Sequence, residues 1–254
     1  MALRKWLAPS AVAALALLVA APSFAQKKYG PGVTDKEIKI GTTTPFSGPA
    51  SAYSASAVSA TAFFTMINEK GGINGRKINY VALDDAYSPP KTVEQVRKLV
   101  ESEEVLFLVN NVGTATNMAV VKYINQKQVP HLFIGSGATV FNDPEHYPWS
   151  LSWTPHYASE GEIYAKWILT NKPDARVGIL SQNDDLGRDY LLGFKRGLGE
   201  KADKMIVSQQ VYNSTDPTVD SQILTLKASG ADTMINICTP KFSAQAVRRV
   251  YDSG

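Results

Sequence analysis

The chain has 254 residues, 44% of them hydrophobic, which is enough for one or two globular domains. Its 26 lysine and arginine residues nearly balance 23 aspartate and glutamate residues, which excludes the strongly basic surface of a nucleic-acid-binding protein. Cys238 is the only cysteine, so an internal disulfide framework is also excluded.

The first residues have the pattern of a secretory signal peptide. Arg4 and Lys5 precede an apolar run at 7–21, and a small-x-small sequence ends at Ala25. The run is too short for a membrane-spanning helix. We expect residues 1–25 to be a leader that is removed on export. Gln26 follows the leader in place of a cysteine, so we expect no lipid anchor.

Short apolar strands then alternate with helices. The first series is predicted to contain strands at 38–43, 78–83, 105–109 and 131–134. Its helices are predicted at 54–70, 90–102 and 116–126. Gly71-Gly72 ends the first helix, and Ser88-Pro89 provides a cap and a first-turn proline for the second.

The same alternation resumes after residue 150. Helices are predicted at 158–170, 187–198, 221–228 and 244–251, and strands at 177–180, 205–211 and 233–237. An irregular, aromatic-rich segment at 137–157 separates the two series. Alternation of this kind predicts an α/β fold with parallel sheets covered by helices. We therefore expect two α/β lobes, at 26–150 and 151–254.

Three loops after predicted strands are rich in glycine and hydroxyl residues. They are 45–49, which includes Ser47, then 113–116, which includes Thr114, and 136–139. Ligands of open parallel sheets bind at the carboxyl ends of the strands. Glycine allows close approach to the backbone, and amide and hydroxyl groups can hold an anion without a cation. The alternative is that the threonine hydroxyls only cap a helix.

Four stretches, in this order, resemble the periplasmic leucine/isoleucine/valine-binding protein family: IKIGTTTPFSGPASAYSAS, INEKGGINGRKINYVALDDAYSPPKTVEQVRKLV, NNVGTATNMAV and GSGATVF. The resemblance covers about residues 36–252. Members of this family are type I substrate-binding proteins of ATP-driven importers. The resemblance implies two α/β lobes that close as a hinge on a small ligand in the cleft between them. It also implies a periplasmic monomer that serves an inner-membrane ABC permease, with no cofactor and no nucleic acid as partner.

The resemblance also implies where the ligand binds. The loop matched by Gly113 and Thr116 would hold a ligand carboxylate, and Tyr53 would cover the ligand side chain. The second loop would contribute backbone and hydroxyl groups of Gly137, Ala138 and Thr139.

Three positions depart from the family pattern. The aspartate and glutamate that bind a ligand ammonium are matched by Tyr157 and Lys241, and an aromatic residue is matched by Leu186. An ammonium without a counter-charge is costly to bury, and a lysine would repel it. We therefore expect an organic acid, preferably an aromatic carboxylate, with Tyr53, Tyr157 and Trp153 as flat walls.

Alternatives remain open at these positions. Glu160, Asp184 or Asp185 could replace the missing acids, which would permit a branched-chain amino acid as ligand. Lys241 could equally be an ordinary exposed lysine. A sensory receptor domain on the same scaffold is a further possibility.

An enzyme is not expected. The three histidines lack the H-E-x-x-H spacing of a zinc site, and no G-x-S-x-G nucleophile elbow occurs. The family's paired cysteines are matched by Tyr87 and Val112. The family's chain continues further and returns to the first lobe, so we expect both lobes to be incomplete here.

Overall fold

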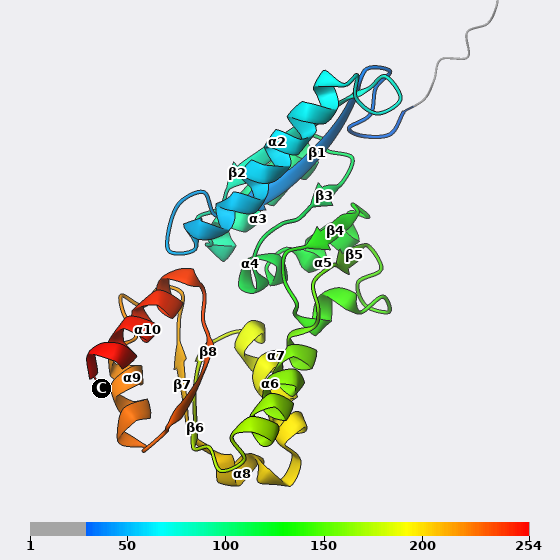
Figure 1. Ribbon diagram of the computed structural model, residues 1–254. Coiled ribbons are helices and arrows are strands. Elements are labelled where there is room, and N and C mark those ends of the chain that lie inside the picture. The colour runs from blue at the N-terminus through cyan, green and yellow to red at the C-terminus, as the bar shows by residue number, and fades with distance from the viewer. Residues whose placement is uncertain (1–28, 254) are drawn as a thin grey trace, which may run out of the picture. The chain divides into compact units, whose positions relative to one another are not determined.

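The structure is a computed structural model that describes residues 29–253 (Figure 1). The predicted leader and its cleavage point lie outside these residues. Within 29–253, no helix combines the length and the apolar character needed to cross a membrane.

The first sheet has five strands in the order β2-β1-β3-β4-β5, and every neighbouring pair is parallel. The strands are β1 (Glu37–Thr44), β2 (Lys77–Asp84), β3 (Leu108–Val109), β4 (His131–Ile134) and β5 (Ser150–Ser152). The boundary predicted after residue 150 therefore falls within a strand of this sheet.

Helices lie between these strands: η1 (Ser51–Ser54), α2 (Ala55–Glu69), α3 (Pro89–Arg97), η2 (Lys98–Ser102), α4 (Thr114–Met118), α5 (Val121–Gln126) and η3 (Thr139–Asn142). On one side, Val96, Leu99 and Ile124 of these helices pack with Leu108 of β3 in a buried cluster. α2 is attached to β2 differently, through its Asn68 side chain, which bonds both backbone groups of Ile78.

The predicted strand at 105–109 is shorter than expected. Glu104 and Asn110 have left-handed backbones with φ of 50° and 55°, which interrupts regular pairing at both ends. The segment still follows β1, because Leu106 N donates to Lys39 O and Gly41 N donates to Phe107 O. Only the regularly paired part of this segment, β3, is short.

The second sheet has the order β7-β6-β8, again with parallel pairs only. Its strands are β6 (Val177–Gln182), β7 (Ile206–Tyr212) and β8 (Thr233–Ile237), and its helices are α6 (Tyr157–Asn171), α7 (Asp185–Leu198), η4 (Gly199–Lys201), α8 (Ala202–Met205), α9 (Asp220–Ala228) and α10 (Pro240–Ser253).

Two buried clusters show that helices cover both faces of this sheet. Val177 and Ile179 of β6 pack with residues of α6 and α7, including Phe194. Leu180 packs in the other cluster, with residues of α9 and α10 such as Phe242. This alternation along β6, which is buried throughout, is typical of a doubly wound parallel sheet.

The predicted fold class is confirmed, and each predicted helix and strand has a counterpart. The sequence analysis missed β5, η1, η3, η4 and α8, which are all short. Ser88 lies at the expected cap of α3, but its side chain makes no capping hydrogen bond.

Candidate functional site

A cavity of about 230 Å³ lies beyond the carboxyl ends of the first sheet's strands. We call it the strand-end cavity. It is lined by Tyr53, Ser56, Tyr87, Asn110, Val112, Gly113, Thr114, Gly135, Trp153, Thr154, Tyr157 and Leu186. Four of these residues are aromatic, and none has a charged side chain. The lining residues come from both sides of the segment that joins the two sheets.

The loop after β3 enters this cavity through a fixed backbone. Gly113 has φ of +108°, and a side chain there would place its Cβ 2.5 Å from both Thr116 Oγ1 and Tyr87 Cε2. The neighbouring Asn117 side chain donates to Asn111 O, and Asn111 Nδ2 donates to Thr43 Oγ1. Glycine at 113 is therefore required both by backbone conformation and by space.

Thr114 provides the cavity with a buried hydroxyl. Its Oγ1 lies 2.8 Å from Ser136 Oγ, in the loop after β4, and either atom can donate. Both side chains are almost fully buried. This pair joins two of the loops that the sequence analysis selected.

Tyr157 forms a supported aromatic wall. Its ring stacks on Tyr190 with centroids 4.7 Å apart, and Tyr190 Oη donates to Glu160 Oε2 over 2.6 Å. The ring of Tyr164 also stacks on the ring of Tyr190, and the Tyr164 hydroxyl also donates to Glu160. Burial, together with the bond to Glu160, raises the pKa of Tyr190, so its phenol is neutral.

A second cavity of about 160 Å³ shares Tyr53, Tyr157 and Leu186 with the first. Its other lining residues are Tyr164, Tyr190, Asn236, Ile237 and Cys238. Burial raises the pKa of Cys238 to about 12, so its thiol stays protonated and is a poor nucleophile.

Five of the predicted site residues line the strand-end cavity: Tyr53, Gly113, Thr114, Tyr157 and Leu186. The structure places the other six elsewhere: Ser47, Thr116, Gly137, Ala138, Thr139 and Lys241.

Two of the predicted residues outside the cavity form hydrogen bonds with other groups of the chain. Ser47 Oγ donates to Asp84 Oδ2, and Thr116 Oγ1 donates to the Val112 carbonyl in the turn before it. Threonine hydroxyls often bond backward in this way within helices.

The second predicted loop is occupied by contacts within the chain. The Gly137 carbonyl accepts a hydrogen bond from Tyr157 N, and Ala138 is buried in a hydrophobic cluster. Thr139 donates twice to Asp189. Lys241 Nζ lies 4.8 Å from the centre of the Phe242 ring.

The acids proposed as alternatives also have partners. Asp184 caps α7 by accepting from Leu186 N, and Asp185 pairs with Arg188. Glu160 accepts from the two tyrosines described above. None of these three carboxylates lines the strand-end cavity.

The sequence analysis did not select Ser56, Tyr87, Asn110, Val112, Gly135 and Thr154 for the site. Asn110 and Gly135 directly follow predicted strands, so their position could have indicated them. Tyr87 and Val112 were considered only as replacements of cysteines.

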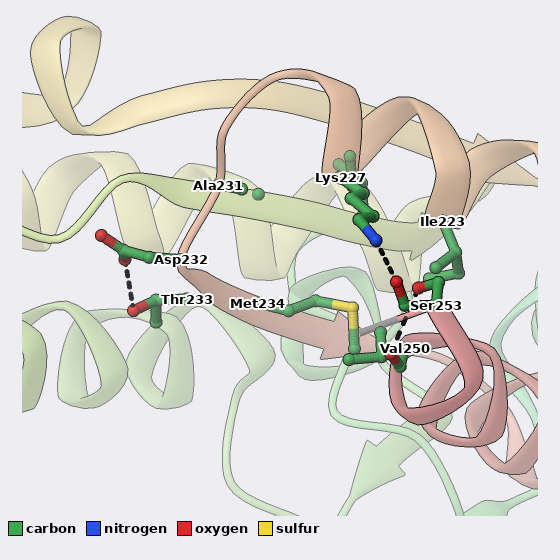
Figure 2. A pocket seen from close by; sticks show the side chains of 10 residues that line it. Ile223, Lys227, Ala231, Asp232, Thr233, Met234, Val250 and Ser253 are labelled. Atoms are coloured by element: carbon green, nitrogen blue, oxygen red, sulfur yellow. Dashed lines mark hydrogen bonds between the residues drawn. The ribbon is translucent and has the colours of Figure 1, made fainter.

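A further cavity, of about 160 Å³, lies between α9, α10 and β8 (Figure 2). Its wall contains Lys227, whose Nζ donates to the Ser253 carbonyl, and Asp232, which accepts from Thr233. Gly178, Asp232 and Thr233 lie near the amino ends of β6 and β8. This is the opposite edge from the one where parallel sheets bind ligands.

The periplasmic binding protein family matches residues 37–254, and the chain belongs to this family. Among curated relatives, it is 24% identical over 240 residues to Leu/Ile/Val-binding protein homolog 7 of Brucella abortus (strain 2308), covering 91% of this chain and 60% of the relative. The chain thus spans about three fifths of that relative's length.

Many solved structures share this fold, including the following two. A substrate-binding periplasmic protein from Ralstonia solanacearum has a TM-score of 0.78 at 27% identity, covering 86% of this chain and 61% of that chain. A solute-binding protein of an ABC transporter from Rhodopseudomonas palustris BisB5 was solved in complex with 3,4-dihydroxybenzoic acid. It has a TM-score of 0.72 at 17% identity, and the match covers 86% of this chain and 59% of that chain. The second likeness shows the fold alone.

Proposed function

We propose that the chain is the ligand-binding part of a periplasmic substrate-binding protein of the branched-chain-amino-acid type. It delivers its ligand to an inner-membrane ABC permease. The ligand is a small organic acid, with an aromatic carboxylate preferred. The observation that carries this proposal is the strand-end cavity, which combines aromatic walls and hydroxyl groups with no charged side chain.

The lining of the cavity disfavours an amino acid. A buried ammonium needs a nearby carboxylate, since an uncompensated charge is expensive to desolvate. Glu160, Asp184 and Asp185 lie outside the lining and already have partners within the chain.

A carboxylate is better suited to this lining. Neutral donors can hold an anion when several of them converge, because hydrogen bonds to a charged acceptor are stronger than neutral ones. The cavity offers the Thr114 hydroxyl and the phenol groups of Tyr53 and Tyr157. These are the donors that we assign to the acid group.

The aromatic residues favour a flat ligand. Tyr53, Trp153 and Tyr157 can each bury a ring face or edge against a ligand ring. The structural neighbour from Rhodopseudomonas palustris BisB5 was solved in complex with 3,4-dihydroxybenzoic acid, a compound of the class that we propose here. Because the lining comes from both sides of the joining segment, ligand binding would draw the two sheets together.

Calorimetric titration of the purified chain tests the proposal. Benzoate and 4-hydroxycinnamate are the acid probes, and L-leucine and L-valine are the amino-acid probes. We expect an aromatic acid to bind at least about tenfold more tightly than either amino acid, since the missing counter-charge penalises an ammonium. Tight binding of leucine or valine alone would instead support the second candidate, which the names of the curated relatives favour.

Two tryptophans provide a matched pair for this titration. Trp153 lines the cavity, whereas Trp167 lies on α6 outside it and is 57% exposed. Trp153→Ala should weaken binding of the acid, and Trp167→Ala should leave it unchanged. Equal effects of the two substitutions would place the ligand elsewhere.

A further inference from the structure

Tyr87 has an unusual backbone for a bulky residue. It and Ala86 both have left-handed conformations, with φ of 58° and 51°. Such conformations are rare outside glycine and persist only where the surrounding structure fixes them. Here Asp85 fixes the turn, because its Oδ1 accepts from Tyr87 N at 2.9 Å. The turn directs a tyrosine side chain into the strand-end cavity.

The ring of Tyr87 is pressed against the backbone of the loop after β3. A Cβ at Gly113 would lie only 2.5 Å from Tyr87 Cε2 and 3.2 Å from Cζ. The ring therefore fills the space in front of Gly113 that a side chain would otherwise take. Tyr87 is 5% exposed, so the ring is a buried part of the cavity wall.

The hydroxyl of Tyr87 approaches the side chain of Gln182, at the end of β6. Gln182 is itself fixed, since its Nε2 donates to Asp184 Oδ2 at 2.6 Å and its Oε1 accepts from Tyr212 Oη at 3.2 Å. Burial raises the pKa of Tyr87, so the phenol remains neutral.

The ring is thus fixed by the turn at Asp85 and by its packing against the loop at Gly113. Rotating it away would leave an unfilled space against Gly113 in a buried wall. A fixed wall of this kind discriminates by size, because a tightly packed site does not expand to admit extra atoms without strain.

We propose that Tyr87 is the specificity-determining residue that closes the inner end of the strand-end cavity and limits the ligand to a single ring. This inference rests on the proposed function for the chemical class of the ligand. Replacing the ring by a small side chain frees the volume of about one aromatic ring, and such apolar cavities accept aromatic guests.

Two acids of different length test the inference by calorimetric titration of the whole chain. Benzoate has one ring, and biphenyl-4-carboxylate has two. The wild-type chain is expected to bind benzoate at least about tenfold more tightly than the biphenyl acid. In Tyr87→Gly, which suits the left-handed backbone, this preference should fall by at least about tenfold.

Two further variants separate the ring from other effects. Tyr87→Asn also tolerates the backbone and removes the ring, so it should show the same loss of preference if the glycine variant does not fold. Tyr87→Phe keeps the ring and loses only the hydroxyl. It should retain the preference for benzoate. Circular dichroism confirms that each variant is folded.

Unchanged discrimination in a folded Tyr87→Gly or Tyr87→Asn chain would overturn the inference. The same comparison is made with L-valine and L-phenylalanine. If only the amino acids bind, the proposed function fails. The inference about Tyr87 then holds if replacing Tyr87 shifts the preference from valine toward phenylalanine, and it fails if the preference stays the same. Absence of binding by all four probes would overturn both proposals.

Discussion

Asp189 accepts both donors of Thr139: the backbone amide at 2.8 Å and the hydroxyl at 3.1 Å reach the same Oδ2 atom. Thr139 was predicted to offer these two groups to a ligand carboxylate. In the structure a carboxylate of the chain itself occupies them. Thr114, from the other predicted loop, keeps its position in the strand-end cavity.

This difference predicts that the two threonines contribute unequally to binding. Thr114→Val removes a hydroxyl from the cavity and should lower the affinity for the preferred acid by about tenfold, the contribution of one hydrogen bond to a charged group. Thr139→Val removes only the surface bond to Asp189 and should change the affinity less than about twofold. Calorimetric titration measures both, and a larger effect at Thr139 would restore the site predicted from the family.

The stacked tyrosines predict an indirect effect on binding. Tyr190→Ala removes the ring that supports Tyr157, so the cavity wall loses its fixed position, and the affinity should fall by about five- to tenfold, within the range of one aromatic pair. Tyr190→Phe keeps the ring and loses only the bond to Glu160. It should therefore lie much closer to the wild-type chain. If the phenylalanine variant binds as weakly as the alanine variant, the hydrogen bond rather than the ring supports Tyr157.

His131 predicts a stability change that depends on pH. It is completely buried in β4, and in the described part of the chain neither ring nitrogen has a hydrogen-bond partner. Burial lowers the pKa of His131 to about 3. The unfolded chain binds a proton near pH 6.5 and the folded chain does not, so folding stability falls as the pH drops from about 6.5 toward 3.

His131→Leu should remove this sensitivity. We expect the free energy of unfolding to rise by about 1–3 kcal/mol, the usual penalty for an unpaired buried polar group. The gain should be larger at pH 5 than at pH 7.5. Thermal melts of both chains at the two pH values measure it, and an equal or smaller gain at pH 5 would contradict the assignment.

Ser47 is predicted to stabilise the fold rather than bind ligand. Burial alone would raise the pKa of Asp84, but hydrogen bonds from Ser47, Ala86 N and Lys91 together hold it well below the usual range. Ser47→Ala should therefore cost about 1 kcal/mol at pH 7. It should leave the affinity for the acid unchanged, because Ser47 is not part of the cavity lining.

The sign of the pH effect follows from the lowered pKa of Asp84. The stability that ionised Asp84 contributes to the fold is present above about pH 4 and is lost as the pH falls below that value. In Ser47→Ala the contribution is smaller, so acid should destabilise the variant less steeply than the wild-type chain. Urea unfolding between pH 7 and pH 3 measures this difference.

Periodicity and caps were sufficient to predict the two parallel sheets. The runs at 78–83 and 177–180 are apolar, short and bounded by turn residues, and β2 and β6 extend each by only a few residues. β5 could not be predicted in this way. Ser150–Ser152 has little apolar character, and it becomes a strand only because β4 lies beside it.

The candidate site was predicted only in part, because the partners of its side chains also depend on neighbouring elements. The position of Gly113 at a strand end is visible in the sequence, whereas the partner of a hydroxyl is not. Thr139 and Asp189 are far apart in the chain, so their pairing depends on how α7 packs. Tyr87 was missed because its role depends on a left-handed turn that no local preference of tyrosine predicts.

The paired hydroxyls of Thr114 and Ser136 give the cavity an adjustable surface. When the Ser136 hydroxyl donates the hydrogen bond to Thr114, the Thr114 hydroxyl is free to donate a hydrogen bond to a ligand. When Thr114 donates, only its lone pairs remain to face that ligand. Exchange between the two states needs rotation of two hydrogens and no movement of heavier atoms. Under the proposed function, the same wall can therefore meet both the ionised and the neutral form of an acid group.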